Sequence, residues 1–148
     1  MNKSTQIKVI EGGKHTDKNG AIGFINDFSF DKIKRFYFIE LPKKKMIRAF
    51  HGHMKESKAV FVIQGSIILN LARIDNPKKP DPKQLIKRII LTSKETQICI
   101  IPKGFANGIM SLEKNTKVII YSDKTTQESI MDDFRYDENY WGKNAWKN

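Results

Sequence analysis

Two histidines one residue apart, His51 and His53, are the side chains of this chain best suited to chemistry. They follow Arg48 and precede a β-rich run that begins at Lys58. Alternate residues of a strand point to the same face, so both imidazoles can enter one cavity. Two imidazoles on one wall serve either as metal ligands or as acids and bases near neutral pH. The third histidine, His15, lies in a polar segment that we expect to be a loop.

The elements that position this pair are predicted to be strands. Runs of β-branched and aromatic residues recur about every 8–12 residues, which is typical of an all-β sandwich or barrel. Small antiparallel barrels hold ligands in an open mouth that is lined by alternate residues. One short helix is expected near residues 127–131. The predicted strands are residues 6–10, 21–26, 35–40, 46–50, 58–63, 66–74, 84–92, 96–101, 107–112 and 117–122.

The length of 148 residues indicates a single domain over residues 1–148. No run approaches the roughly 20 apolar residues of a transmembrane helix, and the first residues lack the apolar block of a signal peptide. The single cysteine, Cys99, excludes an internal disulfide and lies in an apolar run, so we expect a buried structural thiol. These features predict a cytoplasmic protein that does not bind a membrane.

The formal charge of +11 comes mainly from lysines, many of them beside prolines, where solvated loops are expected. No nucleic-acid-binding motif accompanies them, so we predict no nucleic-acid partner. A lysine-rich surface, or a positive rim that attracts an anionic small molecule, remains open. The Pro/Lys stretch 75–83 is expected to be a loop. The aromatic C-terminal segment 125–148 is expected to pack on the barrel.

The His-x-His pair resembles the first metal-binding motif of the cupin superfamily, whose fold is a jelly-roll β-barrel. That motif has a glutamate four or five residues later, where this chain has Ser57 and Lys58. The second cupin motif ends in histidine, where this chain has Asn107. Glu56 is one residue out of register, which is expected to turn it to the other face. With two ligands missing, no metal and no cofactor are expected, and a metal-dependent cupin oxygenase is the last alternative.

A closer resemblance is to the dTDP-4-dehydrorhamnose 3,5-epimerases and the related cupin sugar 3,4-ketoisomerases (WxcM-like). Residues 48–53, RAFHGH, resemble the Arg-Gly-x-His of the epimerases and the Arg-Gly-x-His-Ala-His of the ketoisomerases. Residues 101–108, IPKGFANG, resemble the epimerase sequence Ile-Pro-x-Gly-Phe-Ala-His-Gly. Residues 17–20 and 34–37 resemble the early segment of the ketoisomerases. The similarity covers roughly residues 15–125, and the combination is more specific than any single motif.

This resemblance implies proton transfer on a nucleotide-linked 4-keto sugar, in which the carbonyl acidifies the hydrogens on C3 and C5. His51 would be the base, Lys58 would stabilise the enolate oxygen and Tyr121 would return the proton. Arg48 would bind the diphosphate, because a guanidinium grips two oxygens at once. The further substrate-binding residues expected are His53, Asn107, Arg35 and Tyr37.

Two departures from the epimerases concern the carboxylates that accompany the base. The epimerases carry an aspartate where this chain has Leu69, and we expect no counterpart of their C-terminal extension with its second acidic partner. Asp132 and Asp133 are candidates to replace it. Other interpretations remain open, with Tyr121 packing in the core and Arg48 pairing with Glu40.

The sequence therefore predicts a single-domain cupin barrel, forming a homodimer, that epimerises C3, C5 or both of a nucleotide-linked 4-keto-6-deoxy sugar. Such sugars are used in surface polysaccharide biosynthesis. One alternative is 3,4-ketoisomerisation, with the His-x-His pair moving a proton between C3 and C4. Another alternative, suggested by Leu69 and Asn107, is a non-catalytic sugar-nucleotide-binding cupin.

Overall fold

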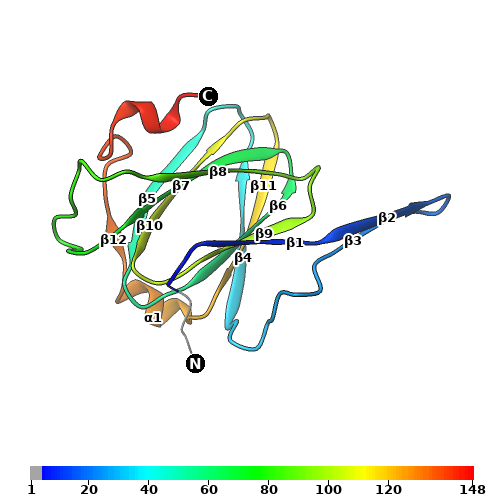
Figure 1. Cartoon of the computed structure of the whole chain (residues 1–148), viewed down its shortest axis with the longest axis horizontal. Coiled ribbons are helices and arrows are strands. Elements are labelled where there is room, and N and C mark those ends of the chain that lie inside the picture. The colour runs from blue at the N-terminus through cyan, green and yellow to red at the C-terminus, as the bar shows by residue number, and fades with distance from the viewer. Residues whose placement is uncertain (1–4) are drawn as a thin grey trace.

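Two antiparallel five-stranded sheets face each other and form a barrel in the computed structural model, which describes residues 5–148 (Figure 1). The first sheet has the order β1 (Lys8–Glu11), β9 (Gln97–Ile101), β6 (Lys58–Gln64), β11 (Thr116–Ser122) and β4 (Arg35–Leu41). The second sheet has the order β12 (Phe134–Arg135), β5 (Ile47–His53), β10 (Phe105–Ser111), β7 (Ser66–Arg73) and β8 (Lys87–Thr92). The all-β prediction is confirmed.

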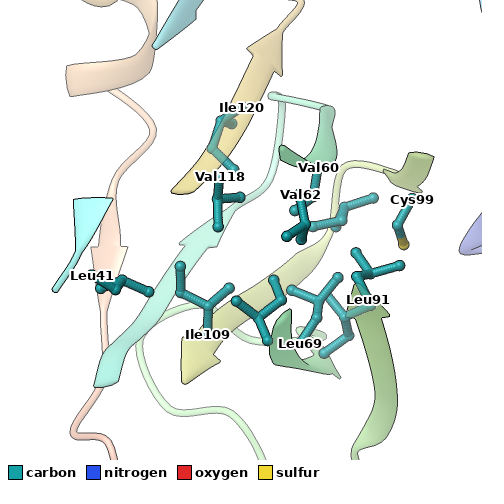
Figure 2. Close-up of a cluster of buried hydrophobic side chains, with 12 residues drawn as sticks. Leu41, Val60, Val62, Leu69, Leu91, Cys99, Ile109, Val118 and Ile120 are labelled. Carbon is teal, nitrogen blue, oxygen red and sulfur yellow. The ribbon is translucent and has the colours of Figure 1, made fainter. Parts of the chain in front are cut away.

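The main hydrophobic core lies between these sheets (Figure 2). Alternate residues of each strand enter it, as the period of two requires, for example Val60 and Val62 from β6 and Leu69 and Leu71 from β7. Leu69 is completely buried in this core. Cys99 is buried here as well, and desolvation raises the pKa of its thiol to about 12, which makes it unreactive.

One hairpin projects from the body of the barrel, formed by β2 (Gly13–Asp17) and β3 (Gly20–Phe24) (Figure 1). The expectation that His15 lies in a loop was therefore wrong. Both faces of β2 are largely exposed, so its residues need no apolar alternation, and the sequence pattern lacks the usual strand signal. Gly20 closes the turn with a φ of 122°, a conformation that favours glycine.

The C-terminal segment contains α1 (Thr126–Ile130), β12 and a 3₁₀ helix (Lys143–Trp146). A capping box between Thr125 and Glu128 starts α1, which coincides with the predicted helix to within one residue at each end. Further along, Trp141 and Trp146 pack on the outer face of the second sheet. The polar atoms of Tyr136, Tyr140 and Trp141 donate to backbone oxygens of the 75–83 loop, at 2.6, 2.5 and 3.0 Å. The segment thus holds that loop against the barrel.

Most other strands begin or end within about three residues of their predicted bounds. Within residues 5–148, no helix is long and apolar enough to cross a membrane.

Candidate functional site

A pocket of about 490 Å³ lies between the two sheets. Its apolar lining includes Val60, Ile109 and Ile120, which also belong to the core. Its polar lining comes from both sheets and from the C-terminal segment. The charged or hydrogen-bonding residues that line it are Arg35, Tyr37, Glu40, Arg48, His51, His53, Lys58, Asn107, Thr126, Ser129, Asp133 and Arg135.

A bulge in β5 brings Arg48 to the same pocket as the histidines. In the β5–β10 ladder, His51 pairs with Asn107 and Arg48 pairs with Ile109. Three residues along β5 therefore span the same distance as two residues along β10. Residues three apart on a regular strand point to opposite faces. The extra residue restores the phase, so Arg48 lines the pocket together with His51 and His53.

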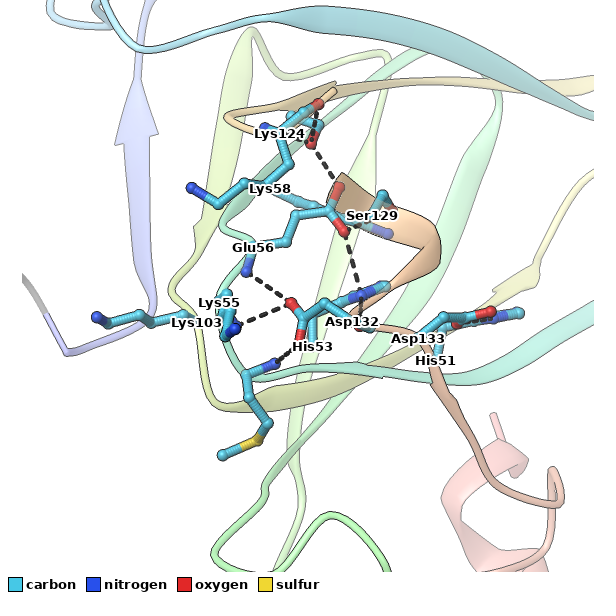
Figure 3. A network of polar contacts seen from close by, with 12 residues as sticks. His51, His53, Lys55, Glu56, Lys58, Lys103, Lys124, Ser129, Asp132 and Asp133 are labelled. Atoms are coloured by element: carbon cyan, nitrogen blue, oxygen red, sulfur yellow. Dashed lines mark hydrogen bonds and ion pairs between the residues drawn. The ribbon is translucent and has the colours of Figure 1, made fainter. Parts of the chain in front are cut away.

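His53 is fixed in one tautomer by its neighbours (Figure 3). Its Nδ1 lies 2.7 Å from the backbone oxygen of Asp132, an atom that only accepts, so Nδ1 carries the proton. Glu56 Oε2 lies 3.1 Å from the same nitrogen. Nε2 of the neutral ring is then free to accept a proton, and it is buried without a hydrogen-bond partner among residues 5–148. This is the arrangement expected of a base in the pocket.

Glu56 is the hub of a buried polar network (Figure 3). Its side chain is fully shielded from solvent. Oε1 accepts from Arg35 Nη2 at 3.2 Å and from the hydroxyl of Ser122, and Oε2 accepts from Ser129 Oγ at 2.9 Å. A buried carboxylate is tolerated when it is paired and hydrogen-bonded in this way. Glu56 therefore connects β4, β11 and α1 to His53.

Asp132 ties the C-terminal segment to the end of β5. Its carboxylate accepts from the backbone nitrogens of Met54, Lys55 and Glu56 at 2.8 to 2.9 Å. The side chain is therefore used for the loop, while its backbone oxygen orients His53. Asp132 acts on the pocket by positioning this neighbour.

His51 has its own carboxylate neighbour, because Nδ1 lies 3.9 Å from Asp133 Oδ1. Asp133 also accepts from Arg135 Nε at 3.0 Å, and Arg135 stands opposite His51 in the β12–β5 ladder. Asn107 Nδ2 donates to the backbone oxygen of His51 at 3.1 Å. The side chain of His51 is about one-third exposed, so it can meet a ligand that enters from solvent.

The first sheet supplies the facing wall of the pocket with Tyr37 and Lys58. Lys58 Nζ donates to Tyr37 Oη at 3.3 Å. The guanidinium of Arg35 lies 5.0 Å from the centre of the Tyr37 ring, in a cation–π contact. A phenol and an ammonium group thus lie across the pocket from the two imidazoles.

The pKa values of both imidazoles are lowered from 6.5, first by desolvation and next by the charge of Lys58. Asp133 opposes this at His51, and Glu56 opposes it at His53. Both rings are therefore neutral at pH 7 and able to accept a proton.

Seven of the eight site residues expected from the sequence line this pocket, and Tyr121 does not. On β11, Ile120 lines the pocket, so its neighbour Tyr121 points to the opposite face. There the Tyr121 ring packs against Phe28, Phe30 and Phe36, with ring centres 5.4 to 6.2 Å away. Tyr121 therefore lies outside this pocket, and Tyr37 is the tyrosine that lines it.

Sequence reasoning missed the partners of the histidines. Glu56 was expected to face away, because strand alternation was extended past His53, where β5 ends. The signal in the sequence was its position three residues after His53, where a turn can bring the carboxylate back to the imidazole. Asp132 and Asp133 were named only as candidates, since nothing in the sequence brings them near β5. In the described part of the chain, no three His, Cys, Asp or Glu side chains form a group suited to a metal ion.

Comparison with known proteins identifies the family of this chain. Residues 9–140 match the family model of dTDP-4-dehydrorhamnose 3,5-epimerase. A comparison with curated protein sequences found no match.

Among solved structures, the dTDP-4-dehydrorhamnose 3,5-epimerase of Bacillus anthracis with TDP and PPi bound is similar at a TM-score of 0.73 and 20% identity, over 91% of this chain and 81% of that one. A second similar structure is a variant of a 3,4-ketoisomerase from Thermoanaerobacterium thermosaccharolyticum in complex with TDP-4-keto-6-deoxyglucose. Its TM-score is 0.69 and its sequence identity is 21%, over 91% of both chains. A third is a 3'-monoepimerase from Streptomyces bikiniensis in complex with dTDP-quinovose, with a TM-score of 0.72 and 10% sequence identity. The match covers 89% of this chain and 70% of that one. These likenesses confirm the predicted cupin barrel.

Proposed function

Since the chain belongs to the dTDP-4-dehydrorhamnose 3,5-epimerase family, we propose that it epimerises C3, C5 or both of a nucleotide-linked 4-keto-6-deoxy sugar through an enolate. One observation carries this proposal: His51 and His53 of the second sheet face Tyr37 and Lys58 of the first sheet across one pocket. Inversion at carbon requires a proton to leave from one face of the sugar and return to the other, so groups on opposite walls are needed.

In the proposed reaction His51 removes the proton next to the carbonyl, and Asp133 stabilises the imidazolium that forms. Lys58 neutralises the enolate oxygen, so the reaction uses no metal. Tyr37 returns the proton from the facing wall, in the role that the sequence assigned to Tyr121. The contact between Lys58 and Tyr37 supports this pairing, because it holds the ammonium group and the phenol together on the facing wall.

Arg48 is proposed to bind the diphosphate. It lines the pocket, and it has no ion-pair partner within the described residues. The other two arginines of the lining are already paired, Arg35 with Glu56 and Arg135 with Asp133. An unpaired guanidinium suits two phosphate oxygens.

A second candidate, 3,4-ketoisomerisation, is favoured by the free Nε2 of His53 beside His51. Two acid–base groups on one wall suit proton movements at two adjacent carbons of a sugar. The non-catalytic sugar-nucleotide-binding cupin also remains an alternative, because Leu69 is buried in the core and Asn107 holds the backbone of His51.

Incubation with dTDP-4-keto-6-deoxyglucose in deuterated water, followed by NMR, separates these candidates. Epimerisation predicts deuterium at C3, C5 or both, and ketoisomerisation predicts a carbonyl at C3. His51→Asn should abolish exchange while ligand binding persists, whereas His15→Asn on the projecting hairpin should change neither. Binding by the unaltered protein without any exchange would contradict both catalytic candidates.

The predicted homodimer remains a proposal. We propose that a second copy of the chain packs on the outer face of β4. Phe36 and Phe38 point outward from this edge strand and are 67% and 65% exposed, and Phe30 beside them is 58% exposed. Edge strands with exposed apolar side chains are suited to pairing with another chain.

A further inference from the structure

A second cavity, of about 420 Å³, lies beside the pocket and has a strongly basic lining. It forms where the segment before β4, the β5–β6 loop, the β9–β10 loop and the segment after β11 meet. The lysines that line it are Lys32, Lys55, Lys58, Lys103 and Lys124. The only carboxylate in this lining belongs to Asp123.

The carboxylate of Asp123 offsets only part of the positive charge of this cavity. Within residues 5–148, the lysines that form ion pairs are Lys34 and Lys117, and neither lines the cavity. Asp123 is used for the loop, since its Oδ1 accepts from the backbone nitrogen of Ser57 at 2.9 Å. Like charges gathered around one cavity repel each other, and a bound anion relieves that repulsion.

The backbone that carries two of these lysines is fixed, although their side chains are exposed. The backbone nitrogen of Lys55 donates to Asp132 Oδ2 at 2.8 Å, and that of Lys103 donates to Ser57 Oγ at 3.2 Å. Figure 3 shows both lysines on the side of Glu56 that lies away from His51. Both side chains thus extend from fixed backbone, and neither lines the first pocket.

The rest of the lining suits a small organic or inorganic phosphate. Phe28, Ile33 and Ile100 provide apolar surface, and Ser29 provides a hydroxyl group. The volume falls in the range of roughly 300–1,000 Å³ that is usual for small-molecule sites. Lysine ammonium groups bind phosphate as compact point charges with three donors each.

We propose that this cavity is a second ligand site, which binds a small phosphate-bearing anion of the diphosphate class. The site does not depend on the proposed reaction. It is a neighbour of the first pocket, because Lys58 lines both cavities. Its specificity comes from four further lysines that the first pocket lacks.

The test is a titration of the ¹⁵N-labelled protein with inorganic diphosphate at constant ionic strength, followed by backbone amide shifts. We expect the amides of Ser57, Lys103 and Asp123 to shift with a saturation curve of their own. In Lys55→Gln/Lys103→Gln the shifts of Ser57 and Asp123 should require at least about tenfold more diphosphate, since two charged donors are removed. Shifts at Arg48 and Asn107, which report the first pocket, should be unchanged.

The matched control is Lys78→Gln/Lys79→Gln, which removes the same charge from the 75–83 loop. An equal weakening in this control would show general charge attraction and would overturn the proposal. So would shifts confined to the first pocket, or shifts near Ser57 that persist unchanged in Lys55→Gln/Lys103→Gln. Both double variants change exposed side chains, so folding is preserved.

Discussion

The buried carboxylate of Glu56 joins a base of the pocket to the elements around it. It pairs with Arg35, accepts from Ser122 and Ser129, and lies 3.1 Å from His53 Nδ1. Its negative charge raises the pKa of His53 against the stronger effect of desolvation. At the scale of single residues, the protonation state of His53 therefore depends on a side chain outside the pocket lining.

Glu56→Gln should lower the pKa of His53 further, because the negative charge that favours imidazolium is lost. It should also cost about 3 kcal/mol of unfolding free energy, since Arg35 loses its partner in a partly buried place. The imidazole titration by NMR and urea unfolding measure these two effects. Glu95→Gln, an exposed carboxylate in a turn, is the control. An unchanged His53 titration would contradict the coupling.

The pH dependence of the histidines follows from the sign of their shifts. Both folded pKa values lie below 6.5, so the unfolded chain takes up protons first and stability falls as pH decreases below about 6.5. Both bases stay neutral further into acid than a free imidazole does.

Lys58→Met should raise the pKa of both His51 and His53, since the ammonium group lowers both. Lys117→Met, in an exposed pair with Glu40, should change neither. Imidazole proton shifts between pH 4 and 8 measure both variants. If the two titrations are the same in Lys58→Met as in the unaltered protein, Lys58 does not act on the pair.

At the scale of elements, the phase of each strand decides which expected residues reach the pocket. Alternation placed His51, His53 and Lys58 correctly from the sequence alone. The same rule leaves Tyr121 outside the pocket, because its neighbour Ile120 is the residue of β11 that points inward. The bulge that brings in Arg48 depends on pairing with β10, and the carboxylates come from turns and from the C-terminal segment. Such long-range pairings leave no periodic signal in the sequence.

Tyr37→Phe should reduce formation of the epimerised 4-keto sugar by about 10²-fold or more, since a general acid contributes roughly that factor. Tyr121→Phe removes the same hydroxyl group from the opposite face and should leave epimerisation unchanged. The inverted product is followed by NMR for both variants at equal enzyme concentration. The reverse order of effects would restore the role first expected for Tyr121.

At the scale of the whole molecule, the two sheets differ in what covers their outer faces. The second sheet is covered by the C-terminal segment with Trp141 and Trp146. The first sheet is covered near β1 and β9 by residues around Phe28, and β4 at its edge keeps Phe36 and Phe38 exposed. The uncovered face of β4 borders the pocket, so a second copy placed there would lie close to the substrate.

Phe36→Ser/Phe38→Ser should convert the proposed dimer to a monomer, because both side chains lose their apolar contact with the second copy. Leu85→Ser, which changes an even more exposed residue in another place, should leave the dimer intact. Sedimentation of the three proteins measures their mass in solution. A monomeric unaltered protein, or a dimer that survives the double substitution, would contradict this interface.

The three bonds from Asp132 to residues 54–56 have a consequence for the order in which the protein loosens. They join the end of β5 to the C-terminal segment, which also supplies the backbone oxygen that orients His53. None of the residues in these bonds belongs to the main core between the sheets. Local opening of the C-terminal segment should therefore release the imidazole of His53 before it disturbs the barrel.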